Sequence, residues 1–155
     1  MNSAYENDFA QWATEEGRRL AALAEHPPSG LTGIDLPHLA EEIAGWAAQE
    51  TTEAIDSAAE FIAYDLAYAR AREQGLPDNL WRPWLGRRGQ AWVWLTNLLK
   101  GSPSLRASLE EPERSRRINR LGRAEARGLF RHAGYEPPEI PEPAYTLEGI
   151  LQAFN

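Results

Sequence analysis

The chain has 155 residues, a net charge of −7 and no cysteine, and 43% of its residues are hydrophobic while 25% are charged. This composition is typical of a folded globular protein, and the length fits one domain with a sizeable core. The absence of cysteine excludes disulfides, zinc–thiolate sites and thiol nucleophiles, and it favours a cytoplasmic location.

Neither a secretory leader nor a membrane span is expected. The N-terminus lacks a basic start, and charges interrupt every apolar stretch. The charge is unevenly divided, because residues 1–78 carry 15 acids and 4 arginines, whereas residues 79–155 carry 8 acids, 11 arginines and one lysine. Overall acidity argues against general polyanion binding, although a local face could still be basic.

The first predicted element is an amphipathic helix over residues 4–25. Its apolar residues, from Tyr5 to Leu23, recur at steps of three and four. Two prolines and Gly30 then end the helix, and the chain is expected to be a loop up to Asp35.

A second helical region is predicted over residues 36–73, with Asp35 as its N-cap and Pro37 in its first turn. Unbroken, it would be about 57 Å long, whereas a compact chain of this size is only about 40 Å across. We therefore expect a bend or a break at residues 51–52 or at residues 56–57, where weak helix formers occur.

After a turn at residues 74–79, a third helix is predicted to begin near Pro83 and to end at Gly101. Ser102 and Pro103 begin a fourth helix. Because proline clashes with the preceding turn, this helix is expected to break before Pro112 and to resume up to residue 132, with residue 134 as its glycine cap.

The C-terminal segment is predicted to be a proline-rich arm over residues 136–146, followed by a short docked helix over residues 147–154. No segment shows a strand pattern. The prediction is therefore an all-α fold, an antiparallel helical bundle of four to six helices forming a single domain over residues 1–155.

Four segments, in this order, resemble the bacterial and cyanobacterial family known as domain of unknown function twenty-nine. Residues 5–12 read Y-x-x-D-F-x-x-W, residues 35–43 read D-L-x-x-L-x-E-E-I, residues 98–106 read L-L-x-x-S-P-S-L-R, and residues 145–151 read Y-T-L-E-x-I-L. The resemblance implies an all-helical fold and no assigned activity. One departure is Asp65-Leu66-Ala67-Tyr68, where such proteins tend to show a histidine, two leucines and a lysine.

A metal site is one candidate for chemistry. His38 and Glu42 are one helical turn apart and could ligate a divalent metal ion with Asp65 as a third ligand. A simpler interpretation is that the acids favour the positive end of the helix, and only one carboxylate–histidine pair is present. We therefore expect no metal or other cofactor, and we expect Asp65 to form an ion pair with Arg88.

A row of arginines is the most pronounced local feature. Residues 114–132 hold seven arginines and one acid, and such a face could bind phosphates. Pairing with the acidic first half or with a second subunit is the commoner use and is favoured here, and the aromatic residues that single-strand binding needs are absent. The arginine row consists of Arg116, Arg120, Arg123, Arg127 and Arg131.

Four of the six tryptophans lie between residues 81 and 94, which is more than one helix face can bury. Tryptophan and arginine are typical anchors of protein interfaces. Some of these side chains are therefore expected at a subunit interface or under the C-terminal arm, and the candidates are Trp81, Trp84 and Trp94.

No motif in the sequence indicates a particular reaction. The leading hypothesis is a non-enzymatic interaction module that binds a second copy of itself, or another protein, through the third helix. The alternative is an anion or nucleic-acid binder that uses the arginine row. A weaker alternative is a metal-assisted hydrolase.

Overall fold

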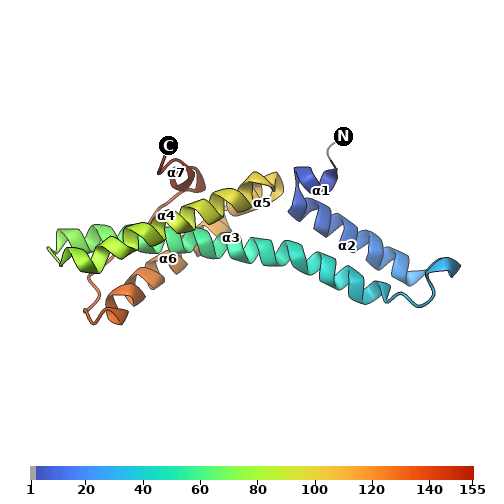
Figure 1. The fold of residues 1–155 in the computed structure, drawn as a ribbon, viewed down its shortest axis with the longest axis horizontal. Coiled ribbons are helices and arrows are strands. Elements are labelled where there is room, and N and C mark those ends of the chain that lie inside the picture. The colour runs from blue at the N-terminus through green and yellow to red at the C-terminus, as the bar shows by residue number, and fades with distance from the viewer. Residues whose placement is uncertain (1–2) are drawn as a thin grey trace. The chain divides into compact units, whose positions relative to one another are not determined.

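The computed structural model describes residues 3–155, which contain seven α-helices, one short 3₁₀ helix and no strand (Figure 1). The predicted all-α fold is confirmed. The chain divides into two compact units, of which the first extends to Glu53 and includes Leu98–Arg106, while the second holds Ala54–Asn97 and Ala107–Asn155. The single domain expected over the whole chain stays a prediction.

The first unit begins with α1 (Ala4–Asn7) and α2 (Phe9–Glu25), so the single helix predicted over residues 4–25 is wrong at one position. Asp8 has an extended backbone with φ −158°, and it both closes α1 and caps α2. Its side chain accepts a hydrogen bond from the backbone N–H of Gln11, which a residue inside a continuous helix could not do. A 3₁₀ helix, η1 (Ser29–Leu31), follows in the loop.

The next helix, α3 (Leu36–Glu73), is a continuous helix of 38 residues, so the break considered in this region does not occur. The hydroxyls of Thr51 and Thr52 donate to the carbonyls of Ala47 and Ala48 one turn back, so both residues are accommodated within the continuous helix. The predicted N-cap is confirmed, because Asp35 accepts a hydrogen bond from the backbone N–H of His38 at 3.1 Å.

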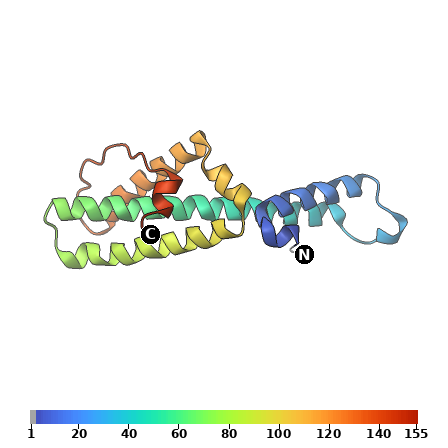
Figure 2. The same cartoon turned by 90° about the horizontal axis from the view of Figure 1, so that it is seen from above.

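The second unit packs the C-terminal part of α3 against α4 (Asp78–Lys100) and α6 (Pro112–His132) (Figures 1 and 2). Small side chains on α3 let large ones from the other helices pack close to it. The core cluster consists of Ala63, Ala67, Ala71, Trp84, Ala126, Phe130 and Ile140.

Two predicted helix boundaries are confirmed and one is wrong. The break before Pro112 is present, because α5 (Pro103–Leu109) ends before it. Gly134 ends α6 with φ +84°, a conformation that favours glycine. In contrast, α4 begins five residues before Pro83, which lies inside the helix. Pro83 is the sixth residue of α4, so it removes the hydrogen bond that a backbone N–H there would donate to the carbonyl of Asn79.

The C-terminal arm has no regular structure before α7 (Leu147–Leu151), and Figure 2 shows it passing from the end of α6 to that helix. Thr146 caps α7 by accepting a hydrogen bond from the backbone N–H of Gly149. The helix is shorter than the predicted residues 147–154. Within residues 3–155, no helix is both long and apolar enough to cross a lipid bilayer.

Candidate interaction surfaces

The antiparallel hairpin formed by α2 and the first part of α3 is held together by small side chains. Ala10, Ala13 and Gly17 are the buried residues of α2. A Cβ atom on Gly17 would lie 3.0 Å from the Cβ of Ala44, which is tighter than ordinary packing. The two helices therefore approach so closely that their large side chains must point elsewhere.

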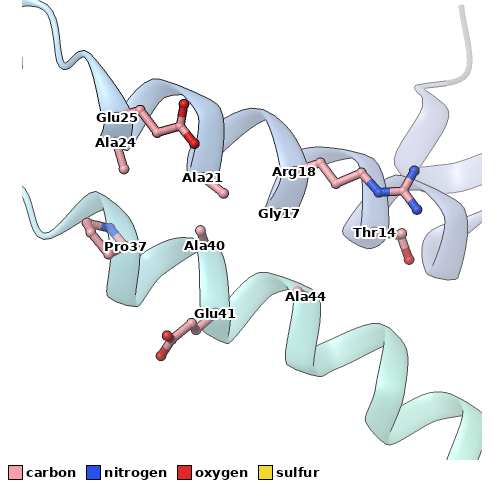
Figure 3. Close-up of a pocket in the computed structure, with 10 residues that line it drawn as sticks. All are labelled: Thr14, Gly17, Arg18, Ala21, Ala24, Glu25, Pro37, Ala40, Glu41 and Ala44. Atoms are coloured by element: carbon pink, nitrogen blue, oxygen red, sulfur yellow. The ribbon is translucent and has the colours of Figure 1, made fainter.

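One side of the hairpin has an open groove of about 630 Å³. Figure 3 shows Ala21 and Ala24 of α2 pointing toward Pro37 and Ala40 of α3. Its charged residues are exposed, and the hydroxyl of Thr14 already donates to a backbone carbonyl of α2. The groove is therefore lined mainly by small apolar side chains, with exposed charges around them.

The other side of the hairpin carries large apolar residues, each of which directly precedes a small residue facing the hairpin contact or the groove. One residue is a rotation of about 100° around an α-helix, so the large residues form a second row beside the small ones. Since α2 and α3 are antiparallel, the row of large residues on α2 and the row of large residues on α3 lie on the same side of the hairpin. This large-residue seam consists of Phe9, Trp12, Leu20 and Leu23 on α2 and of Leu39, Ile43 and Trp46 on α3.

Aromatic contacts join the two halves of the large-residue seam. The ring of Phe9 lies 6.4 Å from that of Trp46 on α3, and Tyr5 of α1 packs edge-on against both Phe9 and Trp12. The surface is nevertheless open to solvent, because Trp46 is 45% exposed and Leu39 is 38% exposed. The seam is thus an apolar surface that α1 covers at its Phe9–Trp12 end and that stays exposed at Leu23, Leu39 and Trp46.

Asp8 ties the start of α2 to the segment before α5. Its carboxylate accepts hydrogen bonds from the hydroxyls of Ser102 and Ser104, each at 2.8 Å, and from the backbone N–H of Ser104 at 2.6 Å. Burial tends to raise the pKa of Asp8, but hydrogen bonds from Gln11, Ser104 and Ser102 outweigh it and lower the pKa below its ordinary value. Two of the four segments that carry the family resemblance therefore meet at this carboxylate.

Glu50 lies one turn beyond Trp46 on α3, at the end of the large-residue seam. Its Oε2 atom is buried and has no hydrogen-bond partner. Burial, followed by the nearby charges of Glu53 and Asp8, raises the pKa of Glu50. This carboxyl is consequently the least satisfied polar group beside the seam.

Asp65 of the second unit forms the predicted ion pair, with Nη1 of Arg88 at 2.6 Å from Oδ1. The phenol of Tyr145, in the C-terminal arm, donates to Oδ2 at 2.5 Å. Burial, together with the hydrogen bond to Asp65 and its charge, raises the pKa of Tyr145. The arm is further held by Asn119, whose amide exchanges two hydrogen bonds with the backbone of Tyr145. This cluster therefore fastens the arm.

The weak metal candidates are not brought together. His38 and Glu42 form an exposed pair at 3.3 Å in the first unit, whereas Asp65 belongs to the second unit and is occupied by Arg88. No group of three or more histidines and acids in residues 3–155 could hold a metal ion. The geometry gives no support to a metal-assisted hydrolase.

The arginine row lies along α6, and within the described part of the chain none of its members forms an ion pair. Arg116, Arg120 and Arg131 are exposed, whereas Arg123 and Arg127 are half-buried. Arg123 donates from Nε to the carbonyl of Ile140 at 2.7 Å, so it serves the C-terminal arm. The expected pairing with acids of the first half is absent from these contacts.

The tryptophans of α4 lie in different surroundings. Trp84 is buried against Phe130, and Trp81 is half-buried against Tyr68 and Arg72. The indole of Trp92, which was not among the candidates, donates to the carbonyls of Ile150 and Leu151 at the end of α7. Only Trp94, with 49% of its surface exposed, is widely open to solvent.

The sequence pattern indicated an apolar stripe on residues 4–25 but not that part of it would stay exposed, and it did not single out Asp8. The sequence did carry a signal for the seam, because each large residue of the seam is followed directly by alanine. Asp8 carried a weaker signal, since a single acid within a helical pattern is usually a solvated side chain.

The family described as Domain of unknown function DUF29 matches residues 4–154. The fold is similar to the crystal structure of an alpha-helical protein of unknown function from Rhodospirillum rubrum, with a TM-score of 0.73 and 19% sequence identity. The similarity covers 99% of this chain and 92% of that one. No curated protein matches the chain.

Proposed function

We propose that this chain, which belongs to the family described as Domain of unknown function DUF29, is a non-enzymatic helical interaction module that associates with a second copy of itself. The observation that carries the proposal is the exposure of large apolar side chains along the large-residue seam of the first unit. Trp46 is 45% exposed and Leu39 is 38% exposed. Exposed aromatic and aliphatic groups of this kind mark protein-binding surfaces when they are contiguous.

The setting that we propose is the bacterial cytoplasm. A cysteine-free chain supports it, because nothing in the composition exploits an oxidising compartment. The ionisable groups support a role in binding rather than catalysis. Asp65 and Asp8 are both engaged in holding segments of the chain together, so neither is free to act as an acid or a base.

Light scattering on the whole chain tests this proposal. At micromolar concentrations we expect a mass of about twice 17.4 kDa, with the monomer appearing on dilution. A single species of 17.4 kDa over the same concentration range would refute self-association.

A second candidate function is polyanion binding by the arginine row. It is favoured by one observation, namely that no arginine of the row has an ion-pair partner in residues 3–155. It is opposed by the acidic net charge and by Glu139 and Glu142, which flank the arm carbonyl that Arg123 binds. For this reason we place it second.

Fluorescence anisotropy with a labelled duplex oligonucleotide tests the second candidate. Replacing Arg116, Arg120 and Arg131 together by alanine should weaken binding and flatten its salt dependence, because three phosphate contacts would be lost. Arg123 is left intact because it holds the arm. The matched control replaces the exposed Arg18, Arg87 and Lys100 by alanine. Equal binding by both triple variants would refute a specific role of the row.

A further inference from the structure

We infer that the large-residue seam of the α2–α3 hairpin is the surface that contacts the second copy, and that two hairpins complete an antiparallel four-helix bundle. The inference rests on the proposed self-association and adds the surface and its geometry. It replaces the third-helix interface that the tryptophan count favoured, because Trp84 is buried, Trp81 is engaged within the second unit, and only Trp94 of the three candidates is widely open to solvent.

The apolar rows on each helix support a four-helix arrangement. A helix in a four-helix bundle touches two neighbours, so it needs two apolar rows side by side. Both α2 and the first part of α3 have such rows. The small row of each helix is used within the hairpin, where Gly17 approaches Ala44. The large row of each helix is left partly exposed, although Tyr5 of α1 packs on Phe9 and Trp12 at one end, so the hairpin resembles half of a bundle.

A second hairpin of the same chain fits the missing half. Two-fold symmetry places the same surface on both partners, which requires a seam that is complementary to itself. The seam has an aromatic end, with Phe9, Trp12 and Trp46, and an aliphatic end, with Leu23 and Leu39. When one hairpin is reversed against the other, the aromatic end of each seam faces the aliphatic end of its partner. Facing side chains of different size and shape can then interdigitate and fill a core.

The exposed area is in the range that an interface requires. With whole-residue areas of about 150–250 Å² for aromatic side chains, the exposed fractions of Tyr5 and Trp46 leave roughly 200 Å² of aromatic surface in water. Leu23 and Leu39, which are 36% and 38% exposed, and the half-buried members of the seam add to it. A standard interface covers about 800 Å² on each partner, and such an apolar centre surrounded by a polar rim is its usual anatomy.

The charged groups beside the seam permit close approach of two copies. The first unit is acidic, so unpaired acids would repel an identical surface. Glu16, however, lies in line with the seam between Trp12 and Leu20, and Arg19 forms ion pairs with it and with Glu15. These pairs reduce the net charge that two facing hairpins would present to each other.

Site-directed thiol protection tests the inference, because the chain has no cysteine of its own. Leu39→Cys places a thiol on the seam, and Val93→Cys places one at a similarly exposed position of α4, where exposure is 44%. We expect alkylation of the seam thiol to slow by at least about fivefold between submicromolar and high micromolar protein, because association seals it. The α4 thiol should react at the same rate throughout.

The outcomes separate the inference from the proposed function. Slower alkylation of the α4 thiol but not of the seam thiol would overturn the inference and leave self-association in place. Unchanged alkylation rates at both thiols, in a chain that light scattering finds dimeric, would have the same meaning. A monomer at every concentration would overturn both. As a second measurement, Leu39→Asp should give a folded monomer by circular dichroism and light scattering, whereas Trp94→Asp should stay dimeric. The reverse result would also overturn the inference.

Discussion

At the scale of single residues, Asp8 joins two segments that are far apart in the chain. Its carboxylate interrupts the first helix, caps α2, and accepts three further hydrogen bonds from Ser102 and Ser104. A carboxylate bonded to several donors is stabilised in its charged form, which explains the direction of its pKa. One acid thereby sets both the end of α1 and the place where residues 98–106 attach.

Asp8→Asn should reduce the free energy of unfolding by about 1–3 kcal/mol at neutral pH, because a neutral amide replaces a charged acceptor of four hydrogen bonds. The pKa of Asp8 is lowered in the folded state, so its stabilisation is present above the unfolded pKa and is lost as the pH falls toward the folded one. Urea unfolding of both proteins should therefore show a constant difference above about pH 5 that shrinks below about pH 4.

The control for this prediction is Asp35→Asn. Asp35 caps α3 with one hydrogen bond to His38, and asparagine caps a helix about as well as aspartate does. We expect almost no change in stability. If Asp8→Asn were equally silent, the carboxylate would be a simple cap and not the link between the two segments.

At the scale of elements, α6 shows how a glycine can set the distance between two helices. Its buried face includes Gly122, and a Cβ atom there would lie 2.6 Å from Cγ2 of Ile62 and 3.0 Å from the carbonyl of Ala59 on α3. Helix propensity alone would favour alanine. The glycine is required because the two helices are in contact at that point.

Gly122→Ala should therefore lower the free energy of unfolding by about 1–3 kcal/mol, since the methyl group forces α6 and α3 apart. The same change at Gly128, on the same helix, meets nothing within 4 Å and should raise the stability by about 0.5–1 kcal/mol. Thermal or urea unfolding measures both. Two variants of equal stability would mean that α6 does not contact α3 as closely as described.

At the scale of the whole molecule, the two units differ in how they bury apolar groups. The second unit has a core around Phe130, Trp84 and Ile140, and the C-terminal arm covers part of it. The first unit buries small alanines between α2 and α3 and three leucines, and it leaves Trp46 and Leu39 partly exposed to water. Apolar burial is the main favourable contribution to folding, so the first unit gains most from an external partner.

Association with a second copy should make thermal stability depend on concentration. The Tm of the whole chain should rise by roughly 2–5 °C for each tenfold increase in protein concentration, because the partner binds only the folded form. Calorimetry over a wide concentration range measures this shift. Leu39→Asp should remove the dependence, and a wild-type Tm that stays constant would contradict self-association.

The helices were predictable from sequence because their signals are local. Three- and four-residue periodicity, the caps Asp35 and Thr146, and the breaks at Pro112 and Gly134 depend only on neighbours in the chain. The ion pair of Asp65 with Arg88 was also predictable, because a charge on an apolar stripe needs a partner on the facing stripe. The solved structure with a similar fold is also alpha-helical.

Tertiary structure alone decided which apolar rows are used inside the chain. An amphipathic pattern shows that a row needs a partner, but it does not show whether that partner is intramolecular, because burial depends on what packs against the row. On the hairpin the alanine rows meet each other, and Trp46, Leu39 and their neighbours are left facing solvent. The charge balance predicts that the arginine row on α6 pairs with acids of the first half of the chain. In the described residues, however, these arginines have no ion-pair partner. Sequence thus determined the helices, and packing determined which surfaces remain for a partner.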